Sequence, residues 1–319
     1  NNTAVGKDAL TANTTGTENT AVGSLTLDAS TTAQRNTAIG YKAGTTVTTG
    51  SYNSILGAYA GEDINTGQYN TFIGYDNAPN VQDGDFNTTL GANALHTSIS
   101  ADKNTAIGYQ SMYYTTTGNN NVAVGSDSLK ANTTGNNNVA VGYNTLTANT
   151  TGGQNTALGQ NALATNTTGS GNTGIGNGAL DASTTAANNT AVGFSAASLV
   201  STGTQNVAVG TFALDANTTA SNNTAIGYHS LGENTTADNN TAVGFKALYQ
   251  NTTGTRNVAL GVTALEENTT GNYNVAIGYA ALEANTTAAV NTAIGYKALE
   301  ANTTGSGNSA LGYTALVSN

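Results

Sequence analysis

Polar and apolar residues alternate in a short segment that recurs along the whole chain. One copy begins at Asn291 and reads N-T-A-I-G-Y, so Thr, an aliphatic residue and an aromatic residue occupy its second, fourth and sixth places. Such alternation predicts a β-strand, because successive side chains of a strand point to opposite faces. The pattern therefore predicts one face of Thr or Val, aliphatic and aromatic side chains, and an opposite face of Asn, Ala and Gly.

The segment returns every 17 residues without an insertion. Its first Asn is found at Asn2, Asn19, Asn36 and onward to Asn308, which gives 18 full repeats and a final partial repeat of 12 residues. An uninterrupted period of this length is typical of a solenoid. Repeat positions 1 to 17 are counted from these Asn residues below.

The remainder of each repeat predicts a closed coil. Position 9 is Leu in fourteen copies, and we expect a second short extended run around positions 7 to 10. The following A-N-T-T-G segment carries turn residues that would return the chain to the next copy. We therefore expect an all-β parallel β-solenoid of 17-residue coils, built as a single repeat array over residues 1–319.

Residues that hardly vary between copies are expected to form ladders along the stacked coils. Position 4 is always Val, Ile or Leu, and we expect it to fill a narrow core together with the Leu of position 9. Position 5 is always Gly, which indicates a positive φ or a close approach of two backbones. Position 1 is always Asn, either as amides that bond from coil to coil or as turn residues without such bonds. Representative ladder residues are Asn2, Val5, Gly6, Leu10, Asn104, Ile107, Gly108, Asn291, Ile294, Gly295 and Leu299.

A single coil has too small a core to fold alone. Two large aliphatic side chains contribute about 1.5–3 kcal/mol each, whereas ordering costs about 1–2 kcal/mol for each backbone residue. Stacking adds hydrogen bonds but would leave the Ala and Gly face uncovered. We therefore expect several chains to associate side by side through this small-residue face, with a homotrimer as the leading arrangement.

The repeated N-T/S-A-I/V-G-Y-x-A/S-L unit resembles the S-V-A-I-G-x-x-S repeats in the head domains of YadA-like trimeric autotransporter adhesins. It is also similar to N-T-A-I-G-Y-x-A-L arrays of phage-type tail fibres and bacterial surface proteins. The resemblance covers the whole chain and implies a left-handed, trimeric β-roll that serves as a receptor- or matrix-binding head or as a rigid spacer. It further implies an extracellular, cell-surface or virion tail-fibre location, with a host receptor, matrix protein or glycan as partner.

Charge and composition argue against several other classes. Eight scattered Lys and Arg residues against 18 Asp and Glu residues cannot form the basic stripe that nucleic acid requires. No apolar run is long enough to span a bilayer. The chain has no Cys, and its two histidines, His96 and His229, lie in copies far apart, so neither a catalytic triad nor a zinc site is expected. We expect both histidines at the surface, no enzyme activity and no cofactor.

Residues 41–103 depart from the consensus. Gly44 and Gly61 replace Leu, and Pro79 interrupts the pattern. The same stretch concentrates the acidic residues Glu62, Asp63, Asp76, Asp83 and Asp85. A Ca²⁺ site at Asp83 and Asp85 is a weak alternative to degenerate loops, because the stretch lacks the loop of an EF-hand. An irregular patch is nevertheless where a specific partner contact would be easiest to build.

Aromatic residues occupy position 6 in ten copies. Because position 6 shares a strand face with position 4, we expect these rings to pack at a corner of the coil rather than to form a ligand platform. They are Tyr41, Tyr75, Tyr109, Tyr143, Phe194, Tyr228, Phe245, Tyr279, Tyr296 and Tyr313.

A Thr-Thr pair at positions 13 and 14 recurs in fourteen copies and introduces ice binding as an alternative function. Adjacent residues of a strand point to opposite faces, so we expect the hydroxyls to bond to the turn backbone instead. The Asn-Thr-Thr triplets are also glycosylation sequons, as at Asn13, Asn132, Asn149 and Asn166.

Both ends of the chain stay in register with the repeat. Asn1–Thr3 and Thr314–Leu316 still follow the consensus, whereas solenoids usually carry atypical capping segments. We expect this chain to be a segment of a longer fibre.

Overall fold

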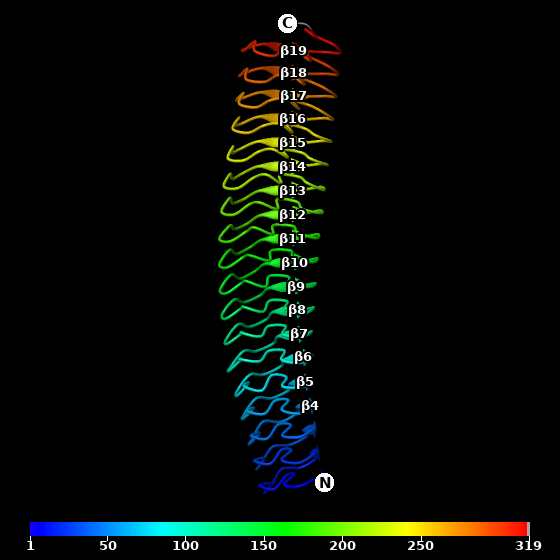
Figure 1. Ribbon diagram of the computed structural model, residues 1–319, viewed down its shortest axis with the longest axis vertical. Coiled ribbons are helices and arrows are strands. Elements are labelled where there is room, and N and C mark those ends of the chain that lie inside the picture. The colour runs from blue at the N-terminus through cyan, green and yellow to red at the C-terminus, as the bar shows by residue number, and fades with distance from the viewer. Residues whose placement is uncertain (318–319) are drawn as a thin grey trace. The chain divides into compact units, whose positions relative to one another are not determined.

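The protein is an all-β parallel β-solenoid. A computed structural model describes residues 1–317, and these residues contain no helix. The chain forms two compact units, Asn1–Asn155 and Thr156–Asn319. Within each unit every coil contributes one short strand, and successive coils stack on one another (Figure 1).

The strands are three residues long and cover positions 2 to 4 of each repeat. In the first unit they are β1 (Thr3–Val5), β2 (Thr20–Val22), β3 (Thr37–Ile39), β4 (Ser54–Leu56), β5 (Thr71–Ile73), β6 (Thr88–Leu90), β7 (Thr105–Ile107), β8 (Val122–Val124) and β9 (Val139–Val141). In the second unit they are β10 (Thr156–Leu158), β11 (Thr173–Ile175), β12 (Thr190–Val192), β13 (Val207–Val209), β14 (Thr224–Ile226), β15 (Thr241–Val243), β16 (Val258–Leu260), β17 (Val275–Ile277), β18 (Thr292–Ile294) and β19 (Ser309–Leu311).

Strands of neighbouring coils pair in parallel, and equivalent repeat positions face each other. Ala4 lies opposite Ala21 in the first unit, and Ile277 lies opposite Ile294 in the second. The predicted parallel solenoid of 17-residue coils is therefore confirmed. Each invariant position forms a row along its unit.

The Gly of position 5 ends each strand. Gly40 has a φ of 142°, a conformation that side chains other than that of Gly rarely adopt. A Cβ added to Gly40 would lie 2.4 Å from the carbonyl oxygen of Gly57 in the next coil. Both expected reasons for Gly, a positive φ and a close backbone approach, are confirmed.

The segment after this Gly is a turn and not the predicted extended run. Position 7 and position 9 have positive φ, as at Lys246 (51°) and Leu248 (54°). The N–H of Lys246 donates to Tyr228 in the preceding coil, and the N–H of Leu248 donates to Ala264 in the following coil, both at 2.9 Å. Left-handed residues thus bend the chain while their N–H groups still bond to both neighbouring coils.

The core contains the Leu of position 9 and the small residue of position 3. Ala293 and Leu299 are fully buried, whereas Val5, Leu56 and Leu260 at position 4 are exposed. The Leu ladder is confirmed, but the predicted core place of position 4 and the predicted outer Ala and Gly face are wrong. An alternating pattern fits a strand with either face inside, because a shift of one residue exchanges the two faces. The Asn and Gly residues that flank the strand therefore decide which face enters the core.

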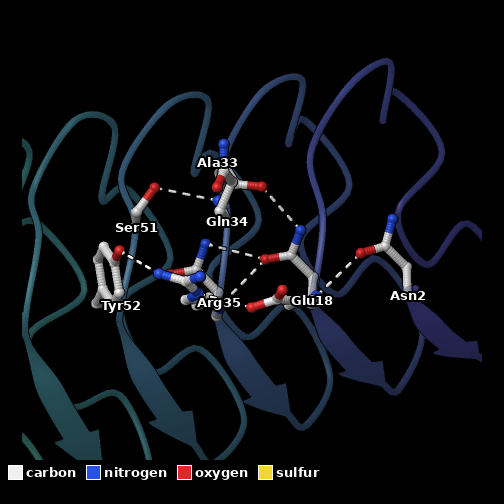
Figure 2. A network of polar contacts seen from close by, with 9 residues as sticks. Asn2, Glu18, Ala33, Gln34, Arg35, Ser51 and Tyr52 are labelled. Carbon is white, nitrogen blue, oxygen red and sulfur yellow. Dashed lines mark hydrogen bonds and ion pairs between the residues drawn. The ribbon is translucent and has the colours of Figure 1, made fainter.

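The Asn of position 1 fixes this choice, because its amide bonds inside the coil. Asn19 Oδ1 accepts the N–H of Asn36 in the next coil at 3.0 Å, and Asn19 Nδ2 donates to the carbonyl of Ala33 at 2.8 Å. The first bond joins adjacent coils and the second closes the coil itself. Figure 2 shows the start of this row at Asn2, whose Oδ1 accepts the N–H of Asn19. Of the two interpretations of this Asn, the coil-to-coil ladder is confirmed.

Position 12 carries a second row of buried Asn residues in the consensus coils. Asn251 Nδ2 donates to Asn234 Oδ1 and to the carbonyl of Gly254, both at 2.9 Å, and Asn268 Nδ2 donates to Asn251 Oδ1 at 2.9 Å. These buried amides bond along the stack, as the amides of the first row do.

Residues 36–86 keep the coil register but use a different core. Ile55 and Phe72 occupy position 3, where most coils have Ala, and both are buried. A Cβ added to Gly44 would lie 2.9 Å from Ile55 Cδ1, and one added to Gly61 would lie 2.9 Å from Phe72 Cδ2. The Gly residues at position 9 therefore leave the space that the larger position 3 side chains of the next coil fill.

Candidate functional site

The side of the sheet that faces away from the core carries an aliphatic side chain in every coil of each unit. It consists of the residues at positions 2, 4 and 6, and we call it the outer face. The position 4 side chains Val5, Leu90 and Leu260 are 58%, 47% and 43% exposed. Contiguous exposed aliphatic side chains of this kind mark interaction surfaces in soluble proteins.

Aromatic rings border the outer face at position 6. All ten rings of this position are exposed in the single chain, so the prediction that they pack in the coil corner is wrong. They point outward because they share the strand face of position 4. Some stack on one another, as in Tyr279 with Tyr296 at 5.3 Å and Tyr296 with Tyr313 at 5.0 Å between ring centroids.

Hydroxyl groups line the outer face of the first unit at position 2. Seven successive coils carry Thr or Ser there, and their side-chain oxygens make no hydrogen bond among the described residues of this unit. They are Thr3, Thr20, Thr37, Ser54, Thr71, Thr88 and Thr105.

The Thr-Thr pairs of positions 13 and 14 behave differently. Thr133 Oγ1 donates to the carbonyl of Thr150 at 3.0 Å, and Thr269 Oγ1 donates to Thr286 at 3.0 Å. The neighbouring Thr134 and Thr270 are exposed. The predicted bonding of a Thr hydroxyl to the turn backbone is confirmed for position 13, so only one hydroxyl of such a pair faces solvent freely.

The Asn residues of the sequons belong to the buried row at position 12. Asn132, Asn149 and Asn166 are fully buried, and Asn132 Nδ2 donates to the carbonyl of Gly135 at 3.1 Å. The folded coils therefore do not present these amides to a glycosylating enzyme.

The two histidines are half-buried and have different surroundings. In the first unit, His96 Nε2 lies 3.1 Å from Asp76 Oδ2, and the His96 ring stacks on Tyr113 at 4.6 Å. In the second unit, His229 lies against the rings of Phe212 at 5.0 Å and Tyr228 at 4.3 Å. Within residues 1–317 no three His, Cys, Asp or Glu side chains come together as a metal site.

Asp83 and Asp85, the residues of the weak Ca²⁺ alternative, hold neighbouring coils together. Asp83 Oδ1 accepts a hydrogen bond from Thr66 Oγ1, and Asp85 Oδ1 accepts one from the backbone N–H of Gln68, both at 2.7 Å. Each carboxylate thus bonds to the coil that precedes its own.

Acidic side chains occupy position 10 in several coils of the second unit, and Glu266, Glu283 and Glu300 form a continuous row there. Burial raises the pKa of Asp215, and burial together with the nearby Glu266 and Glu300 raises the pKa of Glu283. Lys246 pairs with Glu266 at 3.3 Å, and Lys297 pairs with Glu300 at 2.6 Å. These pairs partly neutralise the row.

Sequence reasoning missed a row of charged and aromatic side chains at position 17 of the first unit. Arg35 Nε donates to Glu18 Oε2 at 2.6 Å, and Arg35 Nη1 donates to the hydroxyl of Tyr52 at 2.6 Å (Figure 2). The Tyr52 ring stacks on Tyr69 at 4.7 Å, and Tyr69 stacks on Phe86 at 5.1 Å. The available signal was the presence of aromatic residues at position 17 in three successive copies.

Comparison of the sequence with known protein families and with curated proteins finds no match. Among residues 1–317, no helix is both long and apolar enough to cross a membrane.

Proposed function

We propose that this chain is a structural segment of an extracellular fibre or adhesin. Its coils form a rigid scaffold for attachment or spacing at a cell surface or on a virion tail fibre. Copies of the chain associate side by side through the outer face, with a homotrimer as the leading arrangement and a left-handed β-roll as the coil. The segment has no enzyme activity and needs no cofactor.

The observation that carries this proposal is the exposure of the aliphatic residue at position 4. Leu56 and Leu158, for example, are 46% and 47% exposed, although every copy retains Val, Ile or Leu there. The remaining position 4 residues, such as Val22 and Ile107, are half-buried, so a row of aliphatic side chains reaches solvent along each unit. Burial against further copies would stabilise the assembly by about 25 cal/mol for each Å² of apolar surface removed from water.

The regularity of the coils also favours a structural role. The same positions are buried and the same backbone bonds recur from coil to coil in each unit, whereas catalysis needs one unique constellation of side chains. Partner recognition, by a host receptor, matrix protein or glycan, would have to use the places where side chains depart from the repeat.

Sedimentation equilibrium of the full chain and of the triple variant Ile39→Lys, Leu56→Lys and Ile73→Lys tests the proposal. These side chains point away from the core, so the variant should keep the circular dichroism spectrum of the native chain. We expect the native chain to sediment as a trimer and the variant as a monomer. A matched control places Lys at the exposed position 14 (Thr15→Lys, Thr32→Lys and Thr49→Lys) and should remain trimeric. A native chain that is monomeric at all concentrations would refute self-association.

Ice binding is the second candidate, and the row of free hydroxyls at position 2 favours it. Thr20, Thr37 and their equivalents follow one another at the strand spacing of a parallel sheet. The neighbouring row at position 4 is aliphatic, so only one of the two rows could donate hydrogen bonds to ice. Thermal hysteresis measured on the full chain decides this question, and its absence at micromolar protein concentration would exclude ice binding.

A further inference from the structure

Tyrosine and small residues alternate at position 6 of the first unit. Over seven successive coils, every second coil carries Tyr there, and the coils between carry Ala or Ser. The rings are those of Tyr41, Tyr75, Tyr109 and Tyr143, and the small residues are Ala58, Ala92 and Ser126. In the second unit, Tyr279, Tyr296 and Tyr313 occupy this position in consecutive coils, so the fold itself does not impose the alternation.

The alternation keeps the rings of the first unit apart. Tyr75, Tyr109 and Tyr143 are 59%, 52% and 56% exposed, and we call them the tyrosine row. Among residues 1–317, no other ring stacks on Tyr109 or Tyr143, and no cation lies over them. Tyr59 meets Tyr75 at an interplanar angle of 83°, so it does not stack on that ring either. The tyrosine row therefore leaves ring faces uncovered.

Polar side chains accompany the tyrosine row at position 7. They occupy five successive coils and are Asp76, Asn93, Gln110, Asp127 and Asn144. The N–H of Asn93 donates to the carbonyl of Tyr75 at 3.2 Å, and the N–H of Asp127 donates to that of Tyr109 at 3.0 Å. Each polar residue is thus joined to the coil of a ring or of a small residue before it. Leu25 occupies position 7 in an earlier coil, so the coil does not require a polar residue there.

The position 7 side chains offer both hydrogen-bond donors and acceptors. Among residues 1–317, the side-chain amides of Asn93 and Gln110 make no hydrogen bond. The carboxylate of Asp127 accepts a hydrogen bond from Lys130 Nζ at 2.9 Å, which holds it in place. A carboxylate has about four acceptor sites, so it can still accept further bonds from a ligand.

The spacing of the rings indicates which ligand fits. Rings two coils apart are separated by about 10 Å, because paired strands lie about 4.8 Å apart. In an extended β-1,4-linked sugar chain every second sugar presents the same face, and one disaccharide has a closely similar length. Aromatic rings pack against the apolar faces of sugars, and the hydroxyls at the edges of the sugars both donate and accept hydrogen bonds.

A polyproline II segment is the other extended chain with a matching repeat, about 9 Å for each turn of three residues. Proline has no N–H, so the carboxylates at position 7 would find no donor and would face carbonyl oxygens. The hydroxyls of a sugar chain can bond to carboxylates and amides alike. Charge repulsion by the same carboxylates disfavours an anionic polysaccharide. The position 7 side chains therefore favour a neutral sugar chain.

We propose that the tyrosine row and the position 7 side chains beside it form a binding strip for a neutral, extended β-1,4-linked glucan chain. Each ring packs against one face of every second sugar. The amides of Asn93 and Gln110 and the carboxylate of Asp127 bond to hydroxyls along the edge of the chain. The proposal rests on the proposed role in attachment, with the glucan as the partner, but it does not require that copies of the protein associate.

Isothermal titration calorimetry of the full chain with cellohexaose tests the binding strip, because the three disaccharide units of this ligand match the tyrosine row. Tyr109→Ala introduces the residue that Ala92 provides in the preceding coil, so the variant should fold. We expect it to bind cellohexaose about tenfold more weakly, as when an aromatic residue is removed from the centre of a binding surface. The double variant Asn93→Ala and Gln110→Ala should weaken binding about fivefold.

Tyr296→Ala is the matched control in the second unit. Tyr296 stacks on Tyr279 at 5.3 Å and on Tyr313 at 5.0 Å, so its ring faces are covered by its neighbours. We expect the same substitution at the same repeat position to leave cellohexaose binding unchanged. A loss equal to that of Tyr109→Ala would overturn the proposal.

Ala92→Tyr tests the spacing itself. The added ring would lie one coil from Tyr75 and from Tyr109, the separation at which Tyr279 and Tyr296 stack. It should cover ring faces and weaken cellohexaose binding as much as Tyr109→Ala does, although it adds an aromatic residue. Tighter binding would show that aromatic content and not spacing decides, and would overturn the proposal.

Two ligand controls separate the binding strip from general affinity for sugars or extended chains. Maltohexaose has α-1,4 linkages, which coil the chain, and decaproline is a polyproline II helix. Both should bind more weakly than cellohexaose. Equal or tighter binding of either ligand, or unchanged cellohexaose binding by both Tyr109→Ala and the amide double variant, would overturn the proposal. Should Tyr109→Ala not fold, the amide double variant decides alone.

Sedimentation of the same samples reports self-association separately. A monomeric chain that binds cellohexaose would keep the binding strip and refute the assembly alone. An assembled chain that does not bind cellohexaose would refute the binding strip alone.

Discussion

The coils of residues 36–86 and those of residues 240–290 build the same backbone around different interiors. In the first region Ile55 and Phe72 enter the core at position 3, and Gly44 and Gly61 make room for them at position 9. In the second region position 3 is Ala and position 9 is Leu. The large side chain thus comes from position 3 in the first region and from position 9 in the second, and both are buried, as expected for cores that tolerate coordinated substitution.

The two regions also differ at position 12. Val47, Ile64 and Val81 are buried where the later coils carry the hydrogen-bonded Asn251, Asn268 and Asn285. An apolar row and an amide row therefore serve the same place in the coil. An amide beside an apolar residue keeps only the bonds of its own coil: Asn217 lies next to the buried Val200, and its Nδ2 donates to the carbonyl of Ala220. We therefore expect a continuous amide row to be more stable than an interrupted one.

Substitution of the position 5 Gly should have the largest effect, and the same effect in both regions. Gly57→Ala and Gly278→Ala would each place a Cβ within 2.1 and 2.4 Å of a carbonyl oxygen in the next coil. Backbone strain and overpacking together predict a loss of about 5 kcal/mol in the free energy of unfolding. Urea unfolding followed by circular dichroism checks this value. A loss confined to one region would show that the two backbones are not equivalent.

Phe72→Ala should be the next most costly change. Removing this buried ring leaves a cavity, because Gly61 supplies no side chain to fill the space, and the expected loss is about 3–5 kcal/mol. Adding Gly61→Leu should restore much of the stability, since Leu at this position is the consensus residue and Leu27 adopts a similar φ of 50°. Gly61→Leu alone should destabilise the native core by overpacking. Additive effects of the two substitutions in urea unfolding would contradict the exchange of volume between positions 9 and 3.

Asn251→Val tests whether the amide row must be complete. The substitution leaves Asn234 Oδ1 without this partner and removes one of two hydrogen bonds from Asn268 Nδ2 and from the carbonyl of Gly254, at an expected cost of about 2–3 kcal/mol. Replacing Asn234, Asn251 and Asn268 together by Val, as in the earlier region, should cost less per residue. If the triple variant instead loses three times as much as the single one in thermal unfolding, the two rows are not interchangeable.

The smallest expected effect is the pH dependence of the second unit. Burial raises the pKa values of Asp181, Asp215 and Glu283 in the folded state. The folded protein therefore binds protons at these carboxyl groups more tightly than the unfolded chain does. Their contribution to the free energy of unfolding grows as the pH falls through the raised folded pKa values. It is complete below the ordinary pKa values of 3.8 for Asp and 4.5 for Glu. Glu283→Gln should reduce the rise in unfolding temperature on acidification. An unchanged rise would assign the effect to other groups.

The sequence predicted the features that depend on repetition. The period, the parallel stacking, the buried Leu and the Gly of position 5 all follow from invariant positions and their local chemistry. The prediction that positions 2, 4 and 6 of the strand face the core was wrong, because an alternating sequence fits a strand with either face inside. The deciding contribution comes from the amide of Asn19 and its equivalents, whose partners lie in other parts of the coil and cannot be read from the strand alone.

Side-chain rows outside the strand were also hard to predict. The stacked rings of Tyr52, Tyr69 and Phe86 depend on the left-handed backbone of position 17. Asn is typical of that backbone region and Tyr and Phe are not, so the sequence contains no local indication of it. Leu248 and its equivalents are buried in the same unfavourable backbone region. Local preference failed in both places because contacts between coils outweigh it.

Covalent cross-linking of single Cys variants tests the central claim, which is that copies meet through the outer face. The chain has no Cys, so Ile39→Cys at position 4 and Thr32→Cys at position 14 each introduce the only thiol. A short bis-maleimide applied to the dilute full chain should join copies of the Ile39→Cys protein into covalent dimers and leave the Thr32→Cys protein uncrosslinked on a denaturing gel. Equal cross-linking of both variants, or of Thr32→Cys alone, would contradict the account.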